Sequence, residues 1–148
     1  MDVTATMEAP CPPEELFAWV DDLARYPDWL GIVERAEPFE PTPEGTAAWF
    51  VELRGRLGPF ARSKRLRMER TELAVPSLAV FERRETDGRH HAAWRLRAEV
   101  AAAPHGSSLV MGLHYGGALW GPVLERMLAD EVDASRQRLL GLVSGPTP

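Results

Sequence analysis

The sequence predicts an α+β fold in which a curved antiparallel sheet packs against one long C-terminal helix. Four segments alternate apolar and polar residues with a period of two, which is typical of strands that have one covered face and one solvated face. The last apolar stretch has helical periodicity instead, and the turns between strands are too short for parallel crossovers. We expect residues 1–148 to form a single domain.

The chain begins with a predicted strand and a predicted helix. Residues 3–8 alternate apolar and polar side chains, and the prolines that follow end this strand. Pro13 suits the first position of a helix, with two glutamates after it at the positive helix end. Helical spacing of apolar residues predicts one helix over 13–25, which ends before Pro27, and then a short turn at 28–31.

Six further strands and the long helix complete the predicted order of elements. The strands are expected at 32–39, 49–57, 65–70, 78–85, 92–100 and 108–115, and the facing of 78–85 is ambiguous. The helix is expected over about 120–143. Its predicted apolar stripe consists of Leu124, Met127, Leu128, Val132, Leu139 and Leu142.

Arginines dominate the face that the alternation places in solvent. The acidic residues among them are Glu52, Glu69 and Glu99, so we expect cross-strand ion pairs on a solvated surface. The arginines in question are Arg54, Arg56, Arg65, Arg67, Arg95 and Arg97.

Composition excludes several classes of function. Net charge is −5 and no stretch is strongly basic, so a nucleic-acid partner is not expected. The lone Cys11 excludes an intramolecular disulfide, and the histidines lack metal-ligand spacing, so neither metal nor cofactor is predicted. The start does not resemble a signal peptide, and no apolar run is long enough for a membrane span. A cytoplasmic location is therefore expected, while the oligomeric state stays open.

Residues 9–29 carry a family resemblance. Ala9-Pro10, the run PEELFAWV at 13–20 and the run DLARYPDW at 22–29 resemble the opening of the START and birch-pollen-allergen-like (SRPBCC) superfamily, in its bacterial polyketide cyclase/dehydrase branch. The resemblance implies a helix-grip fold: about seven strands wrapped around the C-terminal helix, two short helices after the first strand, and a deep cavity. Members bind lipids, sterols, quinones or polyketide intermediates, and some cyclise or dehydrate the ligand.

The cavity implied by this fold should be lined by the inward-facing apolar residues. Glu131 and Tyr115 are expected at its polar end, although Glu131 could instead pair with Arg70 or another arginine. No catalytic set of a cyclase matches this chain, so no catalytic residues are predicted. The predicted ligand-binding residues are Trp49, Leu53, Leu66, Met68, Trp94, Leu96, Met111, Leu113, Tyr115, Leu124, Met127, Leu128 and Glu131.

Three functions remain open at this point. The first is binding of an apolar or amphipathic small molecule, similar to a lipid, quinone or polyketide, in the internal cavity. The second is an enzyme of the cyclase/dehydratase type that acts on a ligand in that cavity. The third is a protein-interaction module with the same fold.

Overall fold

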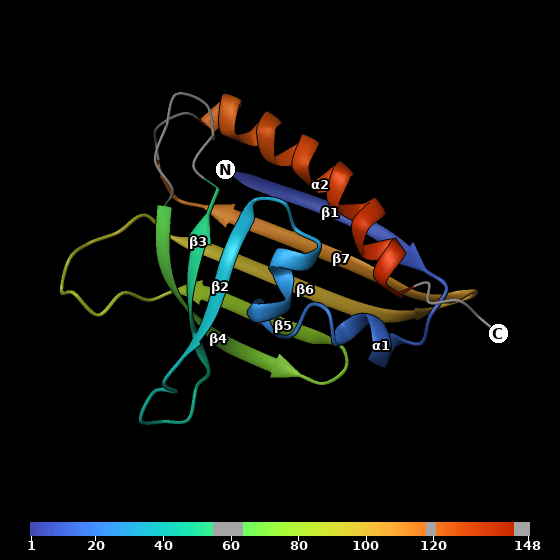
Figure 1. Cartoon of the computed structure of the whole chain (residues 1–148), viewed down its shortest axis with the longest axis horizontal. Coiled ribbons are helices and arrows are strands. Elements are labelled where there is room, and N and C mark those ends of the chain that lie inside the picture. Colours follow the sequence, from blue (N-terminus) through green and yellow to red (C-terminus); the bar gives the residue numbers. More distant parts are fainter. Residues whose placement is uncertain (55–63, 118–120, 144–148) are drawn as a thin grey trace.

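The computed structural model of the chain describes residues 1–54, 64–117 and 121–143, without the side chains of 121–124, 127 and 128. The described strands form one antiparallel sheet of seven strands in the order β1-β7-β6-β5-β4-β3-β2 (Figure 1). The strands are β1 (Asp2–Ala9), β2 (Val33–Phe39), β3 (Ala48–Leu53), β4 (Lys64–Ala74), β5 (Leu78–Arg83), β6 (Trp94–Ala103) and β7 (Gly106–Tyr115). The helices are α1 (Pro13–Phe17), the 3-10 helix η1 (Leu23–Asp28) and α2 (Gly121–Val143). The predicted fold class is confirmed.

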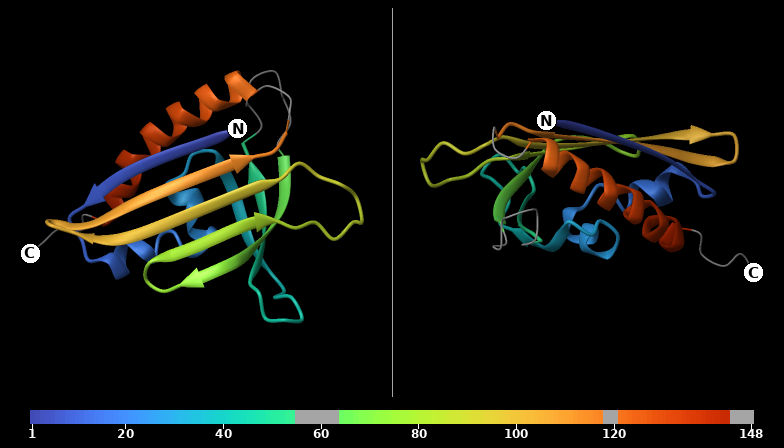
Figure 2. Two further views of the ribbon diagram at one scale, coloured as in Figure 1. Left: turned by 180° about the vertical axis from the view of Figure 1, so that it is seen from behind. Right: turned by 90° about the horizontal axis from the view of Figure 1, so that it is seen from above.

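All three helices lie on one face of the sheet. Viewed from behind, the strands stand in front of α1, η1 and α2, and the view from above shows the sheet curving toward them (Figure 2). The long helix α2 runs beside the edge strand β1 (Figure 1), whereas η1 contacts β2 and β3 at the other end of the sheet. In the part of the chain that the structure describes, no helix is both long and apolar enough to cross a membrane.

The first strand joins the end of the sheet through a close backbone approach. β1 pairs with β7 from Asp2↔His114 to Ala9↔Ser107. At the start of β7, Gly106 has a φ of +146°, and a Cβ built on it would lie 2.2 Å from the Ala9 carbonyl oxygen. Glycine is therefore needed here for both its backbone conformation and its lack of a side chain.

The single helix predicted over residues 13–25 is wrong, because the chain forms α1 and η1 with a turn between them. The Asp22 carboxylate accepts a hydrogen bond from the Ala24 N–H at 2.9 Å and caps the start of η1. A side-chain cap of this kind competes with helix continuation, since it satisfies a backbone N–H without the preceding helical turn.

Long side chains satisfy the carbonyl groups that the broken helix leaves open. The Tyr26 hydroxyl donates to the Val20 carbonyl oxygen at 2.8 Å, and the Trp29 indole N–H donates to that of Trp19 at 3.1 Å. Arg25 donates to a third carbonyl of the same turn at 3.0 Å. Buried carbonyls need such partners, so the Tyr-Pro-x-Trp run holds the turn between the two short helices.

The buried stripe of α2 differs from the predicted one at its C-terminal end. Ser135, Leu139 and Val143 are buried at 1%, 0% and 3% exposure, and their spacing of four places them on one side of the helix. Leu142 is 38% exposed, so its predicted place in the stripe is wrong. It precedes Val143 by one residue, which turns it about 100° away from the buried side.

The charged outer face is less solvated than the sequence predicts. Arg67 and Glu69 are buried at 7% and 9% exposure, and they pair with each other along β4 rather than across strands. Arg97 and Glu99 likewise pair along β6. Residues two apart in one strand share a face, so β4 and β6 each supply both partners of these pairs. Arg95 pairs across strands, as predicted, with Glu82 of β5 at 4.0 Å. Arg56 and Leu57, in the last part of the strand predicted over 49–57, lie outside the described residues.

Candidate functional site

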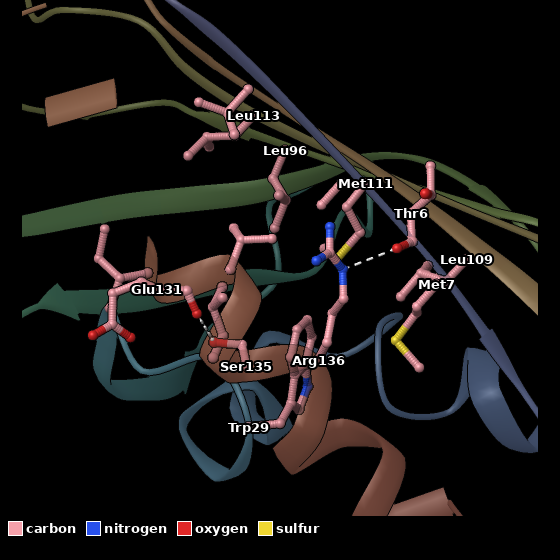
Figure 3. A pocket seen from close by; sticks show the side chains of 15 residues that line it. Thr6, Met7, Trp29, Leu96, Leu109, Met111, Leu113, Glu131, Ser135 and Arg136 are labelled. Carbon is pink, nitrogen blue, oxygen red and sulfur yellow. Dashed lines mark hydrogen bonds between the residues drawn. The ribbon is translucent and has the colours of Figure 1, made fainter. Parts of the chain in front are cut away.

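A pocket lies between α2 and the inner face of the sheet at strands β1, β7 and β6 (Figure 3). Its cavity volume is about 60 Å³, and the surrounding empty space, counted together with the part open to solvent, is about 630 Å³. Most of its walls are apolar. The lining residues are Val3, Ala5, Thr6, Met7, Trp29, Leu30, Ile32, Leu96, Leu109, Met111, Leu113, Glu131, Val132, Ser135 and Arg136.

The strand register builds the sheet wall of this pocket. Val3 lies opposite Leu113 and Ala5 opposite Met111, and side chains of paired residues point to the same face. Leu96 pairs with Leu113 from the next strand, so the wall continues across β6. The period-two alternation of each strand thus produces one continuous apolar surface facing α2.

Polar groups of α2 close the pocket against the segment that follows η1. The Ser135 hydroxyl donates to the Glu131 carbonyl oxygen at 2.6 Å and accepts from the Gly31 N–H at 3.3 Å. The Arg138 guanidinium donates to the Trp29 carbonyl oxygen at 3.0 Å. A Cβ on Gly31 would lie 2.3 Å from a Glu131 carboxylate oxygen. Glycine at position 31 therefore permits this close contact between helix and loop.

Glu131 pairs with an arginine of its own helix. Its carboxylate lies 3.5 Å from the Arg138 guanidinium, and its side chain is 34% exposed. The sequence analysis left open whether Glu131 pairs with Arg70 or with another arginine, and the structure shows Arg138 as the partner. Arg70 does face inward, where it donates to the Asp21 carbonyl oxygen at 2.8 Å and lies over the Trp49 ring.

A second positive group stands at the rim of the pocket. The Arg136 guanidinium donates to the Thr6 carbonyl oxygen of edge strand β1 at 3.0 Å (Figure 3). It also pairs with Asp133. The rim therefore carries the Glu131 carboxylate, the Ser135 hydroxyl and the Arg136 guanidinium above an apolar floor. Such an arrangement suits an apolar ligand with a polar end.

The structure places four of the predicted ligand-binding residues at this pocket: Leu96, Met111, Leu113 and Glu131. Tyr115 is partly buried and packs against Trp94 with ring centroids 4.6 Å apart, but it is not part of the lining. The side chains of Leu124, Met127 and Leu128 lie outside the described residues. The predicted residues that are buried in the core without lining the pocket are Trp49, Leu53, Leu66, Met68 and Trp94.

Several lining residues were not predicted. The alternation of Val3, Ala5 and Met7 identified the first strand, and the same alternation could have assigned them to the cavity wall. Trp29 and Ile32 carried no such signal, because their position depends on how the turn after η1 folds back over the sheet.

The inner face of the sheet therefore has two parts, which we call the packed half and the open half. The packed half consists of the buried residues Trp49, Val51, Leu66, Met68 and Phe81. The open half consists of the partly buried pocket residues Val3, Met7, Leu96, Met111 and Leu113. The Tyr26 ring lies 6.1 Å from Phe81, and Phe81 lies 5.5 Å from Trp49, so η1 and its aromatic neighbours fill the first half.

The groups that could perform metal or thiol chemistry are not assembled for it. Within the described residues, no three side chains of His, Cys, Asp or Glu converge on a common point. Cys11 is buried, with its sulfur 3.8 Å from the Ser107 hydroxyl. Burial raises the pKa of the Cys11 thiol, which lowers the fraction of the reactive thiolate.

Comparison with known proteins identifies the family of this chain. The family model described as "Polyketide cyclase / dehydrase and lipid transport" matches residues 1–142. Two curated relatives from strains of Mycobacterium tuberculosis, Toxin Rv0910 and Toxin MT0934, are each 30% identical over 125 residues, which cover 82% of this chain and 81% of the relative.

Solved structures share the fold at low sequence identity. A START superfamily protein from Mycobacterium smegmatis superposes with a TM-score of 0.74 at 16% identity and 99% coverage of both chains. The Zhui aromatase/cyclase from Streptomyces sp. R1128 has a TM-score of 0.74 at 14% identity, covering 97% of this chain and 93% of its own. The family model, the relatives and the fold agree with the resemblance in residues 9–29. The chain belongs to the polyketide cyclase / dehydrase and lipid transport family.

Proposed function

We propose that the chain binds an apolar or amphipathic small molecule in the pocket between α2 and the open half of the sheet. The observation that carries this proposal is the set of inward-facing apolar side chains that the fold leaves partly uncovered. Val3, Met7, Leu96, Met111 and Leu113 all face the helix, yet none is fully buried. A ligand that covers them gains roughly 25 cal/mol for each Å² of apolar surface removed from water.

The shape of the pocket limits the ligand to a slender molecule. Small-molecule sites typically enclose about 300–1,000 Å³. The comparable volume of this pocket is only about 60 Å³, so a ligand must be slender and must displace flexible lining side chains to enter. Met111 and Met7 belong to the lining, and flexible methionine side chains can adapt to different ligand shapes.

Binding can be tested with an apolar fluorescent dye and two matched tryptophan variants. Met111→Trp should fill the pocket and weaken dye binding about tenfold or more. Val110→Trp adds the same ring at the next position, which is 41% exposed on the outer face, and should leave the affinity unchanged. Equal dye affinities in Met111→Trp and the unmodified protein would contradict an internal site.

Native mass spectrometry of the purified chain addresses both the ligand and its turnover. A co-purifying molecule that is absent from Met111→Trp would be the ligand of this pocket. A mass that changes during incubation, by loss of water for example, would favour the cyclase/dehydratase alternative. In that case Glu131 is the lining residue we would test first as a proton donor or acceptor, since its carboxylate stands at the polar rim.

A second candidate function comes from the curated relatives, which are named toxins. We propose as the alternative that the chain inhibits growth when it is produced in a bacterial cell. Induced expression in a bacterial host with growth recording tests this directly. Growth arrest that persists in Met111→Trp would separate such an activity from ligand binding, whereas normal growth would remove the alternative.

A further inference from the structure

The inner face of the sheet continues beyond the pocket to an aromatic pair. Trp94 and Tyr115 lie opposite each other in β6 and β7, and Leu96 and Leu113 form the next inward-facing pair. At about 3.3 Å per residue along a strand, the two pairs are roughly 7 Å apart. The Trp94 and Tyr115 ring centroids are 4.6 Å apart. The rings therefore extend the wall of the open half by one further step.

A cation lies over these rings without an ionic partner. The Lys64 ammonium nitrogen is 5.4 Å from the Tyr115 ring centroid and 5.8 Å from that of Trp94. Among the described residues, Lys64 forms no ion pair. The residues that the structure does not describe include no Asp or Glu that could pair with it. The inward-facing Arg83, by contrast, pairs with Glu85 at 3.0 Å.

Burial destabilises the unpaired ammonium group of Lys64. Loss of water around the ammonium, followed by repulsion from Arg83, lowers the pKa of Lys64. An ammonium in such surroundings is stabilised by an anion that enters the same site. The aromatic rings attract it as well, but a cation–π contact is weaker than a charge-assisted hydrogen bond to a carboxylate.

A second donor at the same place also lacks a partner. The indole nitrogen of Trp94 is buried, and it has no hydrogen-bond acceptor among the described residues. Trp94 as a whole is 5% exposed. A buried N–H without an acceptor costs about 1–3 kcal/mol, and groups of this kind in native proteins call for an explanation. Lys64 and Trp94 together offer two donors, which matches the two oxygens of one carboxylate.

We infer that this end of the inner face binds the carboxylate of an amphipathic ligand, with Lys64 as its counter-ion and the Trp94 indole N–H as second donor. The inference rests on the proposed pocket and specifies the ligand class as a slender apolar acid. Its apolar body lies along the open half, and its acidic end reaches past Leu96 and Leu113. The four-carbon stem of Lys64 lets the ammonium move off the rings as the acid enters.

Isothermal titration with dodecanoate and dodecan-1-ol, both below their aggregation limits, tests this inference because the two probes differ only at the head group. The unmodified protein should bind the acid about tenfold or more tightly than the alcohol. Lys64→Met should remove that preference and leave the affinity for the alcohol unchanged. Lys64→Arg should retain the preference. Arg65→Met removes the neighbouring exposed charge on the outer face and should behave as the unmodified protein.

The outcomes separate the two proposals. Equal affinities for acid and alcohol, or a preference that survives in Lys64→Met, would overturn the carboxylate site while the apolar pocket stands. Failure of both probes to bind would contradict the pocket as a ligand site, and this inference with it. Lys64→Met should fold normally, because it removes a charge that burial disfavours. Thermal unfolding followed by circular dichroism checks this before the titrations.

Discussion

The packed half and the open half of the sheet have similar side chains but different cover. In the packed half, Trp49, Met68 and Phe81 are at most 5% exposed, because aromatic rings around η1 lie directly on them. In the open half, Met111 and Leu113 face inward with the same strand alternation, yet they remain partly exposed beneath α2. Hydrophobic residues on the inner face are therefore necessary for a pocket, and the covering element decides where it forms.

The difference in cover has a structural cause. Hydrogen bonds from the Tyr26 and Trp29 side chains to backbone carbonyls fix η1 to the preceding turn, and the Tyr26 ring packs on Phe81 of the sheet. α2 makes its polar contacts at its rim: Ser135 and Arg138 bind the loop after η1, and Arg136 binds the edge strand β1. A helix held at its rim in this way can leave space beneath it.

The largest expected effect contrasts one truncation in each half. Phe81→Ala should lower the free energy of unfolding by about 3–5 kcal/mol, because its ring is fully buried among packed aromatics. Met111→Ala should cost only about 1 kcal/mol, since its side chain already borders empty space. Urea unfolding of both variants gives the two values. Similar losses would mean that the two halves are equally packed.

A smaller effect is expected for the hydrogen bond that anchors η1. Tyr26→Phe keeps the buried ring but removes the hydroxyl that donates to the Val20 carbonyl oxygen at 2.8 Å. The unpaired buried carbonyl should cost about 1–3 kcal/mol of unfolding free energy. Because the Tyr26 side chain does not line the pocket, dye affinity in the open half should stay unchanged. Weakened dye binding in Tyr26→Phe would show that the two halves are coupled.

The same hydroxyl should make the packed half sensitive to high pH. Burial, reinforced by the Asp21 and Asp22 carboxylates, raises the pKa of Tyr26 well above its usual value of 10.0. The unfolded chain loses this proton near pH 10 while the native state keeps it, so stability falls as pH rises beyond that point. Urea unfolding at a series of pH values above 9 should show a shallower decline for Tyr26→Phe. Parallel pH profiles would contradict this prediction.

The smallest effect is expected from the carboxylate beside the packed half. Burial raises the pKa of Asp21, although the nearby Arg70 opposes the shift. Its contribution to stability is fully present below the unfolded pKa of about 4 and is lost as pH rises through the higher native pKa. Asp21→Asn should therefore give a flatter stability profile across mildly acidic pH and slightly higher stability at pH 7. A steeper profile in this variant would reverse the assigned direction.

Much of the architecture could be predicted because it depends on local pattern. Alternation identified most strands of the sheet, residue type identified the strand at 78–85, and the 3.6-residue period located α2 to within a residue or so of Gly121–Val143. The candidate pocket was only partly predictable. Strand parity named Leu96, Met111 and Leu113 as inward-facing, but it named Trp49 and Met68 on equal terms, although these two are sealed in the core.

The sequence by itself determined which side of each clearly alternating strand faces inward, because successive side chains of a strand point to opposite faces whatever lies above them. The facing of the strand at 78–85 was settled only by its pairing in the sheet. The sequence also indicated the family, through the residues 9–29 that form the two short helices and their flanking turns. Only the tertiary structure decided which inward-facing residues are covered and which stay open. That outcome depends on where η1 and α2 settle on the sheet, and their contacts join residues as distant as Trp29 and Arg138. Burial of Arg67 and Glu69 on the outer face has the same origin, since a side chain's exposure depends on neighbours that local periodicity does not encode.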